Sequence, residues 1–478
     1  MEFCADVTSK EMTRVVLNPQ LRMRKDIDRI YIFPINPFTY QEKNKRIYIK
    51  PAEAIILALF DGKKSIDDVT RDIQIILKIS ANIASRIVGN VVKRYGEYLV
   101  DADLIDLCHL TVYDPLDFII PKDKIDTDTV FPKIPEIIMF IPTFSCSFHC
   151  KYCYAPGQNN RKLLRLSDIA KFLKQTAEWQ IPSIFFSGGD PYNHPQIADI
   201  MKLCIANKIK PILPTKSILT NKHIDYLCEL GISEIQISID TNNQQECQKL
   251  IGAAGSYVVD LYQQIKTLIS RGFNVYTNTV LTSSTIRNIP LLIRQLYLAG
   301  VKRMSFSQYS RSQFCHCDEL FCTPNDYQWL ENETNKLSEQ LPQIRISYKN
   351  MRDPIFMNQT EKELYFTTRP NCTAGKMGMV ILPDGKVTIC ETLYYQKDLL
   401  LGDLIEASLG EIWHSEQRRR IVKQAHQCLA RDVCTSCPEA EYCYLIKGKC
   451  YVRSLQAFND VKMPDPYCPR SPGGLRIL

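Results

Sequence analysis

Long apolar runs, a secretory signal and dense basic stretches are all missing from this sequence. No stretch of the 478 residues reaches the ~18–20 consecutive apolar residues of a membrane-spanning helix. The first residues, Met-Glu-Phe-Cys, lack the basic-then-apolar form of a signal peptide. The net charge of +7 comes without a dense basic run, so charge gives no argument for nucleic-acid binding. We therefore expect a cytoplasmic protein with neither a membrane nor a nucleic acid as partner.

The composition is that of a globular enzyme. Hydrophobic residues make up 45% and charged residues 23% of the chain. The length leaves room for about three domains of ordinary size. Cysteine is plentiful, with 19 residues, and it is clustered. Because the cytoplasm keeps thiols reduced, a disulfide framework is excluded, and metal clusters are the economical explanation.

The densest cysteine group directly follows an apolar run at 136–143 that predicts a strand. Its sequence is Cys146-Ser-Phe-His-Cys150-Lys-Tyr-Cys153. Thiolates usually hold every iron of a [4Fe–4S] cluster, so three thiolates in one loop leave one iron open to an outside ligand. A partial zinc knuckle is the alternative, although the nearest further ligand, His149, lies between the thiolates.

The spacing resembles the Cys-x3-Cys-x-aromatic-Cys loop of the radical S-adenosylmethionine (SAM) enzymes, with Tyr152 as the aromatic residue. In that family the open iron takes the amino and carboxylate groups of SAM, and one electron cleaves SAM to a 5′-deoxyadenosyl radical. The resemblance implies that Cys146, Cys150 and Cys153 are the catalytic cluster ligands.

Strands and amphipathic helices alternate between residues 134 and 325. Helices are predicted, for example, over 167–179 and 255–271. The strand candidates are 136–143, 183–187, 211–215, 234–239, 274–281 and 302–307. Such βα units in series predict a parallel sheet with helices on its outer face. The resemblance implies an α/β fold, a partial (β/α)6 barrel with its chemistry at the carboxyl ends of the strands.

The resemblance also assigns SAM contacts to the strand ends. The segment Ser187-Gly-Gly-Asp-Pro191 is similar to the family's Gly-Gly-Glu-Pro motif, which holds the SAM amino group. Glycines at a strand end let a backbone approach a ligand closely. Each polar contact taken alone is equally a satisfied residue at a strand end, and His194 is expected to be structural. The implied contacts are Tyr152, Gly188, Gly189, Asp190, Thr220, Asn221, Ser238, Asp240 and Asn278.

A second cysteine field lies near the C-terminal end and resembles the SPASM domain, which binds two auxiliary [4Fe–4S] clusters. Gly385 followed by Cys390 is part of this pattern. The resemblance assigns one cluster to Cys372, Cys390 and Cys450, and the other to Cys434, Cys437, Cys443 and Cys468. A zinc ribbon is the alternative.

The first auxiliary cluster lacks a fourth ligand in this assignment. Cys428, Cys315, Cys317 or Cys322 could supply it; otherwise the open iron could bind a substrate thiolate. The group at 315–322 could equally donate a hydrogen atom or consist of plain thiols. The remaining cysteines, expected to be ordinary thiols, are Cys4, Cys108, Cys204, Cys228 and Cys247.

Residues 26–105 predict a small module of paired strands followed by helices, with strands at 30–33 and 46–50. Helices are predicted from Pro51 to Gly62, from Ser65 with Val69, Ile73 and Ile76 on one face, and over 80–98. This winged-helix-like outline resembles the PqqD-like element of ribosomal-peptide maturases, in which a strand edge captures a leader peptide. A winged-helix DNA binder or a packing module is the alternative.

The domain order predicts the function. Recognition element (26–105), radical SAM barrel (134–325), bridging region (326–368) and SPASM domain (369–470) occur together in peptide maturases such as the subtilosin-type thioether synthases. We expect a leader-bearing precursor peptide, SAM, three [4Fe–4S] clusters, a reductant such as flavodoxin or ferredoxin, and a thioether or other cross-link as product. Maturation of a folded protein, of the sulfatase or quinone-cofactor type, is the alternative. An iron–sulfur winged-helix regulator is a distant third.

Overall fold

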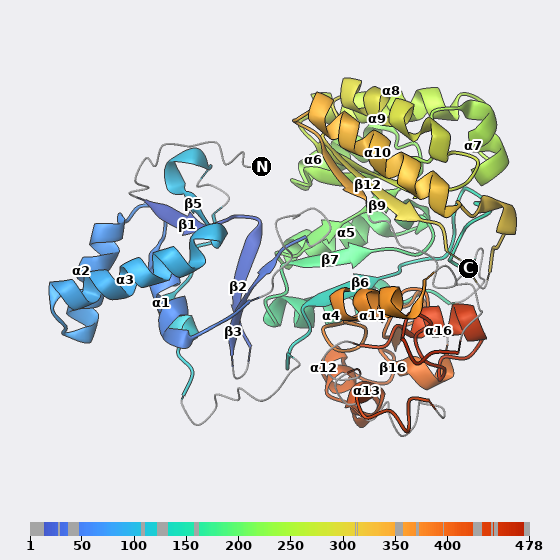
Figure 1. Cartoon of the computed structure of the whole chain (residues 1–478). Helices are drawn as coiled ribbons and strands as arrows, with labels where there is room; N and C mark the ends of the chain where they lie inside the picture. Colours follow the sequence, from blue (N-terminus) through green and yellow to red (C-terminus); the bar gives the residue numbers. More distant parts are fainter. Residues whose placement is uncertain are drawn as a thin grey trace. The chain divides into compact units, whose positions relative to one another are not determined.

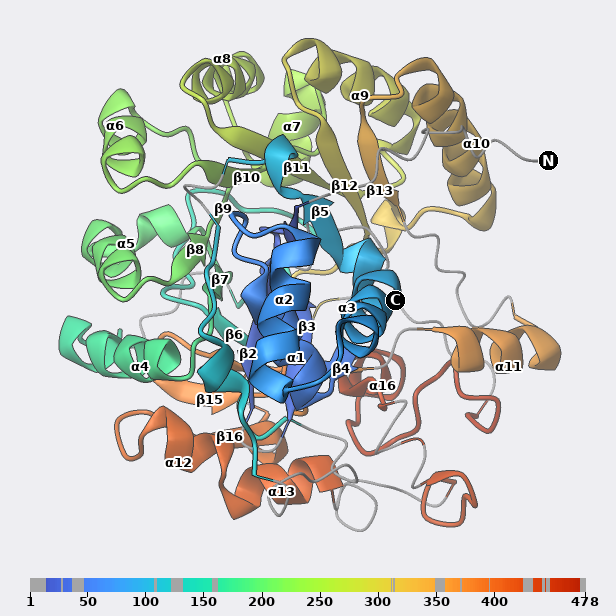
Figure 2. The ribbon, with the colours of Figure 1, turned by 90° about the vertical axis from the view of Figure 1, so that its left-hand side faces the viewer.

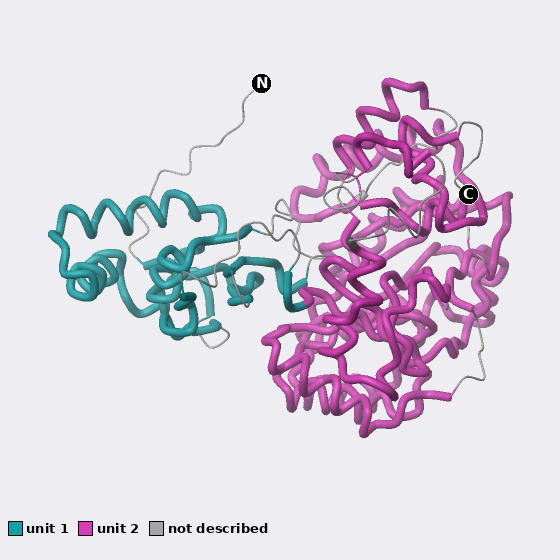
Figure 3. The backbone as a smooth tube through the Cα atoms, turned by 90° about the horizontal axis from the view of Figure 1, so that it is seen from below, with its two compact units in different colours: residues 1–134 teal, residues 135–478 magenta. Residues whose placement is uncertain are grey.

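The computed structural model of the chain divides into two compact units, residues 1–134 and 135–478 (Figures 1 and 3). In the part of the chain that is described, no helix is long and apolar enough to cross a membrane. Cys4, Cys108 and Cys428 lie outside that part. The described residues are 14–26, 29–36, 47–106, 110–121, 132–156, 162–310, 312, 314–348, 357–369, 372–394, 396–423, 433–440, 443 and 448–472.

The first unit contains short antiparallel strands and a group of α-helices (Figure 2). A sheet in the order β2-β3-β4 is formed by β2 (Leu21–Lys25), β3 (Ile30–Pro34) and β4 (Ile47–Ile49). A second pair is β1 (Val15–Leu17) with β5 (Leu99–Asp101). The helices are α1 (Pro51–Leu59), α2 (Ile66–Leu77) and α3 (Ala81–Tyr95).

Helix α2 begins where the sequence predicts it. The Ser65 hydroxyl accepts the Asp68 N–H, and the Asp68 carboxylate accepts the Ser65 N–H at 2.9 Å, which is a capping box. Val69 and Ile73 are buried, as their spacing predicts. Ile76 was expected on the same face, but it is 59% exposed. The helix ends one residue later, with Lys78 in the left-handed conformation, so its last turn extends beyond the packed face.

The second unit is built on parallel strands that follow the predicted candidates closely. They are β6 (Ile137–Phe140), β7 (Ser183–Phe186), β8 (Lys210–Ile212), β9 (Pro214–Thr215), β10 (Glu234–Ser238), β11 (Asn274–Leu281) and β12 (Arg303–Gln308). The predicted third strand is split at Leu213, next to Pro214, which has no N–H for a sheet ladder. As a result β8 pairs with β7 while β9 pairs with β10.

Helices surround the curved row of strands (Figure 2). They are α4 (Leu166–Glu178), α5 (Ile197–Ala206), α6 (Asn221–Glu229), α7 (Gln244–Ile251), α8 (Tyr257–Ser270), α9 (Ile289–Leu298) and α10 (Pro324–Gln340). Their apolar faces and the strands form one large core of buried aliphatic and aromatic side chains. This arrangement brings the carboxyl ends of the parallel strands to one side, where the candidate site lies.

The parallel row extends beyond the predicted strands at both edges. Strand β13 (Arg345–Tyr348), from the region predicted to be only a bridge, pairs with β12. At the other edge, β14 (Gly378–Ile381) pairs in parallel with β6, and β15 (Lys386–Thr388) and β16 (Leu400–Asp403) continue the sheet antiparallel. The C-terminal cysteine field is therefore joined directly to the strand that precedes the Cys146 loop. Helix α11 (Gln359–Thr368) precedes this field. The helices within the field are α12 (Leu409–Trp413), α13 (Glu416–Lys423) and α16 (Tyr451–Phe458).

Candidate functional site

The loop with Cys146, Cys150 and Cys153 follows β6 and is fixed by the end of α7. The His149 N–H donates to the Ile251 carbonyl oxygen at 3.0 Å, and the Lys151 N–H donates to the Leu250 carbonyl oxygen at 2.9 Å. Cys150 is buried, while the other two cysteines are partly exposed. Burial raises the pKa of the Cys150 thiol to about 12 and raises the pKa of the other two as well. The thiols are thus held on one short, anchored loop.

Gly188 and Gly189 lie against the backbone of this loop. The Gly189 N–H donates to the Thr143 carbonyl oxygen at 3.0 Å. A Cβ on Gly189 would come within 2.2 Å of the Ser145 carbonyl oxygen, and one on Gly188 within 2.3 Å of the Ile141 side chain. Gly188 also has φ +107°, which a side chain disfavours. The absence of side chains at both positions therefore makes room for the cysteine loop, and the contact of this backbone with SAM stays a prediction.

Asp190 connects the end of β7 to the segment that follows β9. Its buried carboxylate accepts the Thr215 hydroxyl at 2.8 Å, the Lys216 N–H at 3.0 Å, and the Ser217 N–H at 3.1 Å. It also accepts the Ser217 hydroxyl at 2.8 Å and the Tyr192 N–H at 3.1 Å. These protein donors surround the carboxylate, so Asp190 shapes the site, and its contact with the SAM amino group stays a prediction.

Lys216 is a site residue that the sequence did not single out. Its ammonium lies 2.5 Å from the Asp240 carboxylate and 2.9 Å from the Tyr152 hydroxyl. The Tyr152 hydroxyl also donates to Asp240 at 2.5 Å. The three side chains come from the ends of two strands and from the cysteine loop. A lysine directly after a strand, in Pro214-Thr-Lys216, is the signal that could have indicated it.

Thr220 and Asn221 do not join this cluster. Thr220 is the N-cap of α6, where its hydroxyl accepts the His223 N–H at 3.3 Å, and both residues are exposed. The residues at the actual end of the strand are 215–217, next to Asp190. The structure therefore gives Thr220 and Asn221 a role in starting the helix.

Ser238 and Asn278 lie side by side on β10 and β11. The Asn278 side-chain oxygen accepts the Ser305 hydroxyl at 2.9 Å and the Ser307 hydroxyl at 3.0 Å, both from β12. Ser238, Asn278 and the two serines form a polar strip across the neighbouring strands β10, β11 and β12. His194 is buried, its ring nitrogen accepts the Gln196 N–H at 3.1 Å, and it shapes the turn before α5.

Glu391, directly after Cys390, lies opposite the cysteine loop. Its carboxylate accepts the Ser187 hydroxyl at 2.7 Å and the Tyr154 hydroxyl at 3.4 Å. Burial raises the pKa of Glu391 above its usual value, although the two hydroxyl donors lower it. A carboxyl group with a raised pKa at the junction of two cysteine fields is a candidate proton acceptor. Sequence analysis missed it because its partners lie far away along the chain.

Aromatic rings fill the space beside Glu391. The Tyr394 ring lies 5.0 Å from Phe144, 6.4 Å from Tyr154 and 5.9 Å from Phe314, measured between centroids. Tyr394 is 3% exposed, and its hydroxyl has no hydrogen-bond partner among the described residues. Cys315, next to Phe314, is close enough to Cys153 for its charge to raise the pKa of that thiol, after the larger effect of burial. Charges on Cys153 and Cys390 both act on Tyr394, so this mainly apolar layer of rings lies near both cysteine fields.

Charges on neighbouring thiols act on the C-terminal cysteines. Burial, with a smaller contribution from a negative charge on Cys372, raises the pKa of Cys390 to about 11 and that of Cys450 to about 12. Cys372 therefore lies near both of these thiols, and their binding of one cluster stays a prediction. Of the other thiols considered for the first auxiliary cluster, Cys317 donates to the Glu319 carboxylate at 2.9 Å and Cys322 is buried just before α10, while Cys428 lies outside the described residues.

The second group consists of Cys434, Cys437, Cys443 and Cys468. Burial raises the pKa of Cys443 to about 12 and raises that of Cys468. A negative charge on Cys434 raises the pKa of both thiols further. A negative charge on Cys437 also raises the pKa of Cys468. The four thiols lie close enough to influence one another.

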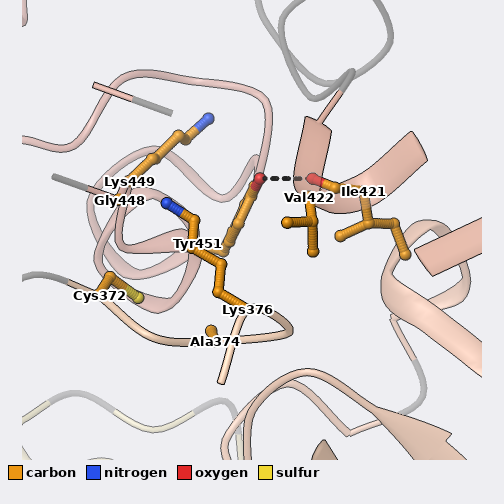
Figure 4. Close-up of a pocket in the computed structure, with 8 residues that line it drawn as sticks. All are labelled: Cys372, Ala374, Lys376, Ile421, Val422, Gly448, Lys449 and Tyr451. Carbon is orange, nitrogen blue, oxygen red and sulfur yellow. Dashed lines mark hydrogen bonds between the residues drawn. The ribbon is translucent and has the colours of Figure 1, made fainter. Parts of the chain in front are cut away.

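A small pocket adjoins Cys372 (Figure 4). Lys376 and Lys449 line it and are only 8% and 3% exposed. Burial lowers the pKa of both lysines to about 8, while nearby cysteine thiolates raise it. The hydroxyl of Tyr451, on the same pocket, donates to the Ile421 carbonyl oxygen at 3.5 Å. Buried cations beside grouped thiols suit an anionic metal cluster.

Comparison with known families decides between cluster chemistry and zinc. Residues 140–295 match the Radical SAM superfamily, and residues 372–438 match the SPASM iron–sulfur cluster-binding domain. The chain carries a radical SAM domain and a SPASM domain. The predicted α/β radical SAM fold with a C-terminal SPASM domain is confirmed.

Several known proteins are similar to this chain over most of its length. The PqqA peptide cyclase of Methylorubrum extorquens (strain PA1) is 21% identical over 336 residues, 69% of this chain and 84% of the relative. The AdoMet-dependent heme synthase of Methanosarcina barkeri is 24% identical over 359 residues, 71% of this chain and 97% of the relative. The crystal structure of Streptococcus suis SuiB bound to S-adenosylmethionine has the same fold, with TM-score 0.62 and 15% identity, covering 96% of this chain and 99% of that chain.

The described residues of the radical SAM–SPASM chain fit the cofactors of its two domains. A radical SAM domain binds SAM and a [4Fe–4S] cluster, and a SPASM domain binds further iron–sulfur clusters. Cys146, Cys150 and Cys153 are the predicted ligands of the first cluster, and three thiolates would leave one iron open for SAM. No three His, Cys, Asp or Glu side chains in the described ranges converge on a single-ion site. Cluster ligands need not converge, because each thiolate binds a different iron.

Proposed function

We propose that the protein is a radical SAM maturase that modifies a ribosomally made precursor peptide, forming a thioether or another cross-link. The observation that carries the proposal is the similarity to SuiB over nearly the whole chain. In its complex with precursor peptide SuiA, SuiB aligns with 94% of this chain at TM-score 0.63. The similarity to PqqA peptide cyclase supports the same substrate class.

In this proposal each cysteine group holds one cluster. Cys146, Cys150 and Cys153 hold the SAM cluster, Cys372, Cys390 and Cys450 hold the first auxiliary cluster, and the group with Cys434 holds the second. When bound, SAM and its cluster supply the 5′-deoxyadenosyl radical, and the auxiliary clusters supply an acceptor for one electron.

The surrounding residues shape the site for SAM and the peptide. Asp190 fixes the backbone at 215–217, and the polar strip of Ser238 and Asn278 offers hydrogen bonds to the nucleoside. The apolar layer around Tyr394 excludes water, which would compete with the substrate for a reactive radical.

Glu391 is the proposed proton acceptor. Closing a cross-link removes two hydrogens from the peptide, so a hydrogen atom, a proton and an electron must leave the substrate. Ser187 and Tyr154 hold the Glu391 carboxylate at the junction of the two cysteine fields. From there it can take the proton while the hydrogen atom goes to the radical.

The first unit is the proposed site for the leader peptide. The β2 edge of its sheet is covered, because the Met23 N–H donates to the Tyr113 hydroxyl at 3.0 Å and Arg22 donates to Thr111 at 2.6 Å. In the described residues, β4 pairs with β3 alone. An extended peptide can therefore add to β4 through backbone hydrogen bonds. We also propose a cytoplasmic enzyme that receives electrons from a flavodoxin or ferredoxin.

The test is the mass of a short cysteine-containing peptide encoded beside this gene, after anaerobic co-expression with the enzyme. We expect the loss of two hydrogens together with the loss of one free thiol. A peptide of unchanged mass, from cells in which the enzyme cleaves SAM, would contradict the peptide assignment and favour maturation of a folded protein.

A further inference from the structure

A buried ion pair lies beside the cysteine loop of the radical SAM site. The Lys216 side chain is 14% exposed and that of Asp240 is 2% exposed, and their charged atoms are 2.5 Å apart. Asp240 also accepts the Val280 N–H at 3.2 Å. The Tyr152 hydroxyl, 2.9 Å from the Lys216 ammonium, connects the pair to the cysteine loop.

Stability alone does not explain this pair. Taking two charges out of water costs several kcal/mol per ion, and apolar residues of similar volume often stabilise a protein equally well. A barrel interior lined by aliphatic side chains could accept such residues here. We therefore expect the two charges to have a function at the site.

The position of Lys216 provides that role. The Lys216 ammonium lies 5.6 Å from the centroid of the Tyr152 ring, and Tyr152 stands between Cys150 and Cys153 in the loop. The Asp240 carboxylate accepts the hydroxyl of the same tyrosine. Charges this close to the cysteine loop also act on whatever its thiols bind. A cluster becomes more negative by one unit on reduction, so a nearby cation favours the reduced form and a nearby anion disfavours it.

We propose that the Lys216–Asp240 pair sets the reduction potential of the cluster held by Cys146, Cys150 and Cys153, with Lys216 raising it and Asp240 lowering it. One electron enters from an external reductant, and no bond forms or breaks at the pair. The inference rests on the proposed cluster ligands and does not depend on the peptide substrate.

The test is a reductive titration of the reconstituted full-length protein, followed by electron paramagnetic resonance. Variants that lack the auxiliary cysteines Cys372 and Cys434 isolate the signal of the SAM cluster. In this background K216M is expected to shift the midpoint potential to a more negative value, and D240N to a more positive one. K216R keeps the charge and is expected to stay near the parent. The control is K210M, which removes a 44%-exposed lysine of β8 that pairs with Glu234 of β10.

The proposal is overturned if K216M and D240N both keep the parent potential at normal iron content, or if both shift it in the same direction. If K216M does not load a cluster, D240N and K216R decide the question. Failure of the ligand assignment would be recognised separately, because a C150A variant would then retain the signal of the SAM cluster.

Discussion

At the residue scale, the cysteine loop depends on backbone contacts that no cysteine spacing describes. Gly189 packs so closely on Phe144 and Ser145 that these residues leave no space for a methyl group. The same contact aligns the Asp190 N–H with the Ser145 carbonyl oxygen at 3.0 Å. The position of the thiols is therefore fixed from the neighbouring strand end.

The variant G189A is expected to lose most of its SAM cluster, because its Cβ would displace the loop that holds the thiols. Iron content and the visible absorbance of the cluster measure the effect. The matched control is G89A in α3, where an added Cβ meets nothing within 4 Å. Full cluster content in G189A would show that the close contact does not position the loop.

The variant E391Q is expected to slow peptide modification by about 10²–10⁴-fold, the usual contribution of a general base. SAM binding and cluster content should not change. Because burial raises the pKa of Glu391, the fraction of the enzyme with ionised Glu391 increases as the pH rises through that raised pKa. The wild-type rate should therefore increase with pH in this range, and the E391Q rate should not. The exposed E406Q is the control, and equal pH profiles for wild type and E391Q would contradict the assignment.

Spacing along the chain predicted the cysteines but not their neighbours. The cysteines of the Cys146 loop and of the C-terminal field have characteristic spacings, so the sequence alone predicts which thiols belong together. Lys216 meets Asp240 across 24 residues, and Glu391 meets Ser187 across 204. Only the fold creates these contacts. The carboxylate of Asp190 likewise could not be assigned to the backbone at 215–217 without the structure.

At the scale of elements, charged side chains tie the strands together at the amino end of the barrel. Glu234, at the start of β10, lies 2.6 Å from Lys210 on β8 and 2.7 Å from Arg303 on β12. Burial raises the pKa of Glu234, but the two cations lower it to below its usual value. One carboxylate thus connects three strands.

The variant E234Q is expected to destabilise the protein by about 2 kcal/mol at neutral pH, since it removes charge-assisted hydrogen bonds. A lowered pKa stabilises the fold above the unfolded pKa, and this contribution is lost as the pH falls through the folded pKa. The difference in the free energy of unfolding between wild type and E234Q should therefore become smaller at acidic pH. Chemical unfolding at several pH values measures it, with the exposed E229Q as control. A constant difference at all pH values would exclude the ion pairs as its source.

Strand positions were predictable where the strand is central and apolar, as in 183–187, or central and rich in β-branched residues, as in 274–281. The split of the third strand arises where Leu213 and Pro214 pass from one sheet to the other, which depends on the curvature of the whole row. Strand β13 was missed because its sequence, Arg-Ile-Ser-Tyr, is short and partly polar at the edge of the sheet.

At the scale of the whole molecule, the first unit is the proposed leader-peptide site and the second unit carries the radical SAM and SPASM domains. A precursor peptide without its leader is therefore expected to be modified more slowly, by at least about tenfold, which corresponds to the loss of 1.4 kcal/mol of binding. Supplying the leader as a separate peptide should restore only part of the rate, because the tether is lost. SAM cleavage without peptide should be equal in all samples. Equal rates with and without the leader would remove the recognition role of the first unit.

The central claim is that the enzyme removes a hydrogen atom from a precursor peptide. Transfer of deuterium from the peptide to 5′-deoxyadenosine tests this most directly. The precursor peptide is prepared with deuterium on its carbon-bound positions and incubated anaerobically with the reconstituted enzyme, SAM and a reductant. The account predicts 5′-deoxyadenosine that carries one deuterium, formed together with the cross-linked peptide. Deuterium-free 5′-deoxyadenosine beside an unchanged peptide would contradict it.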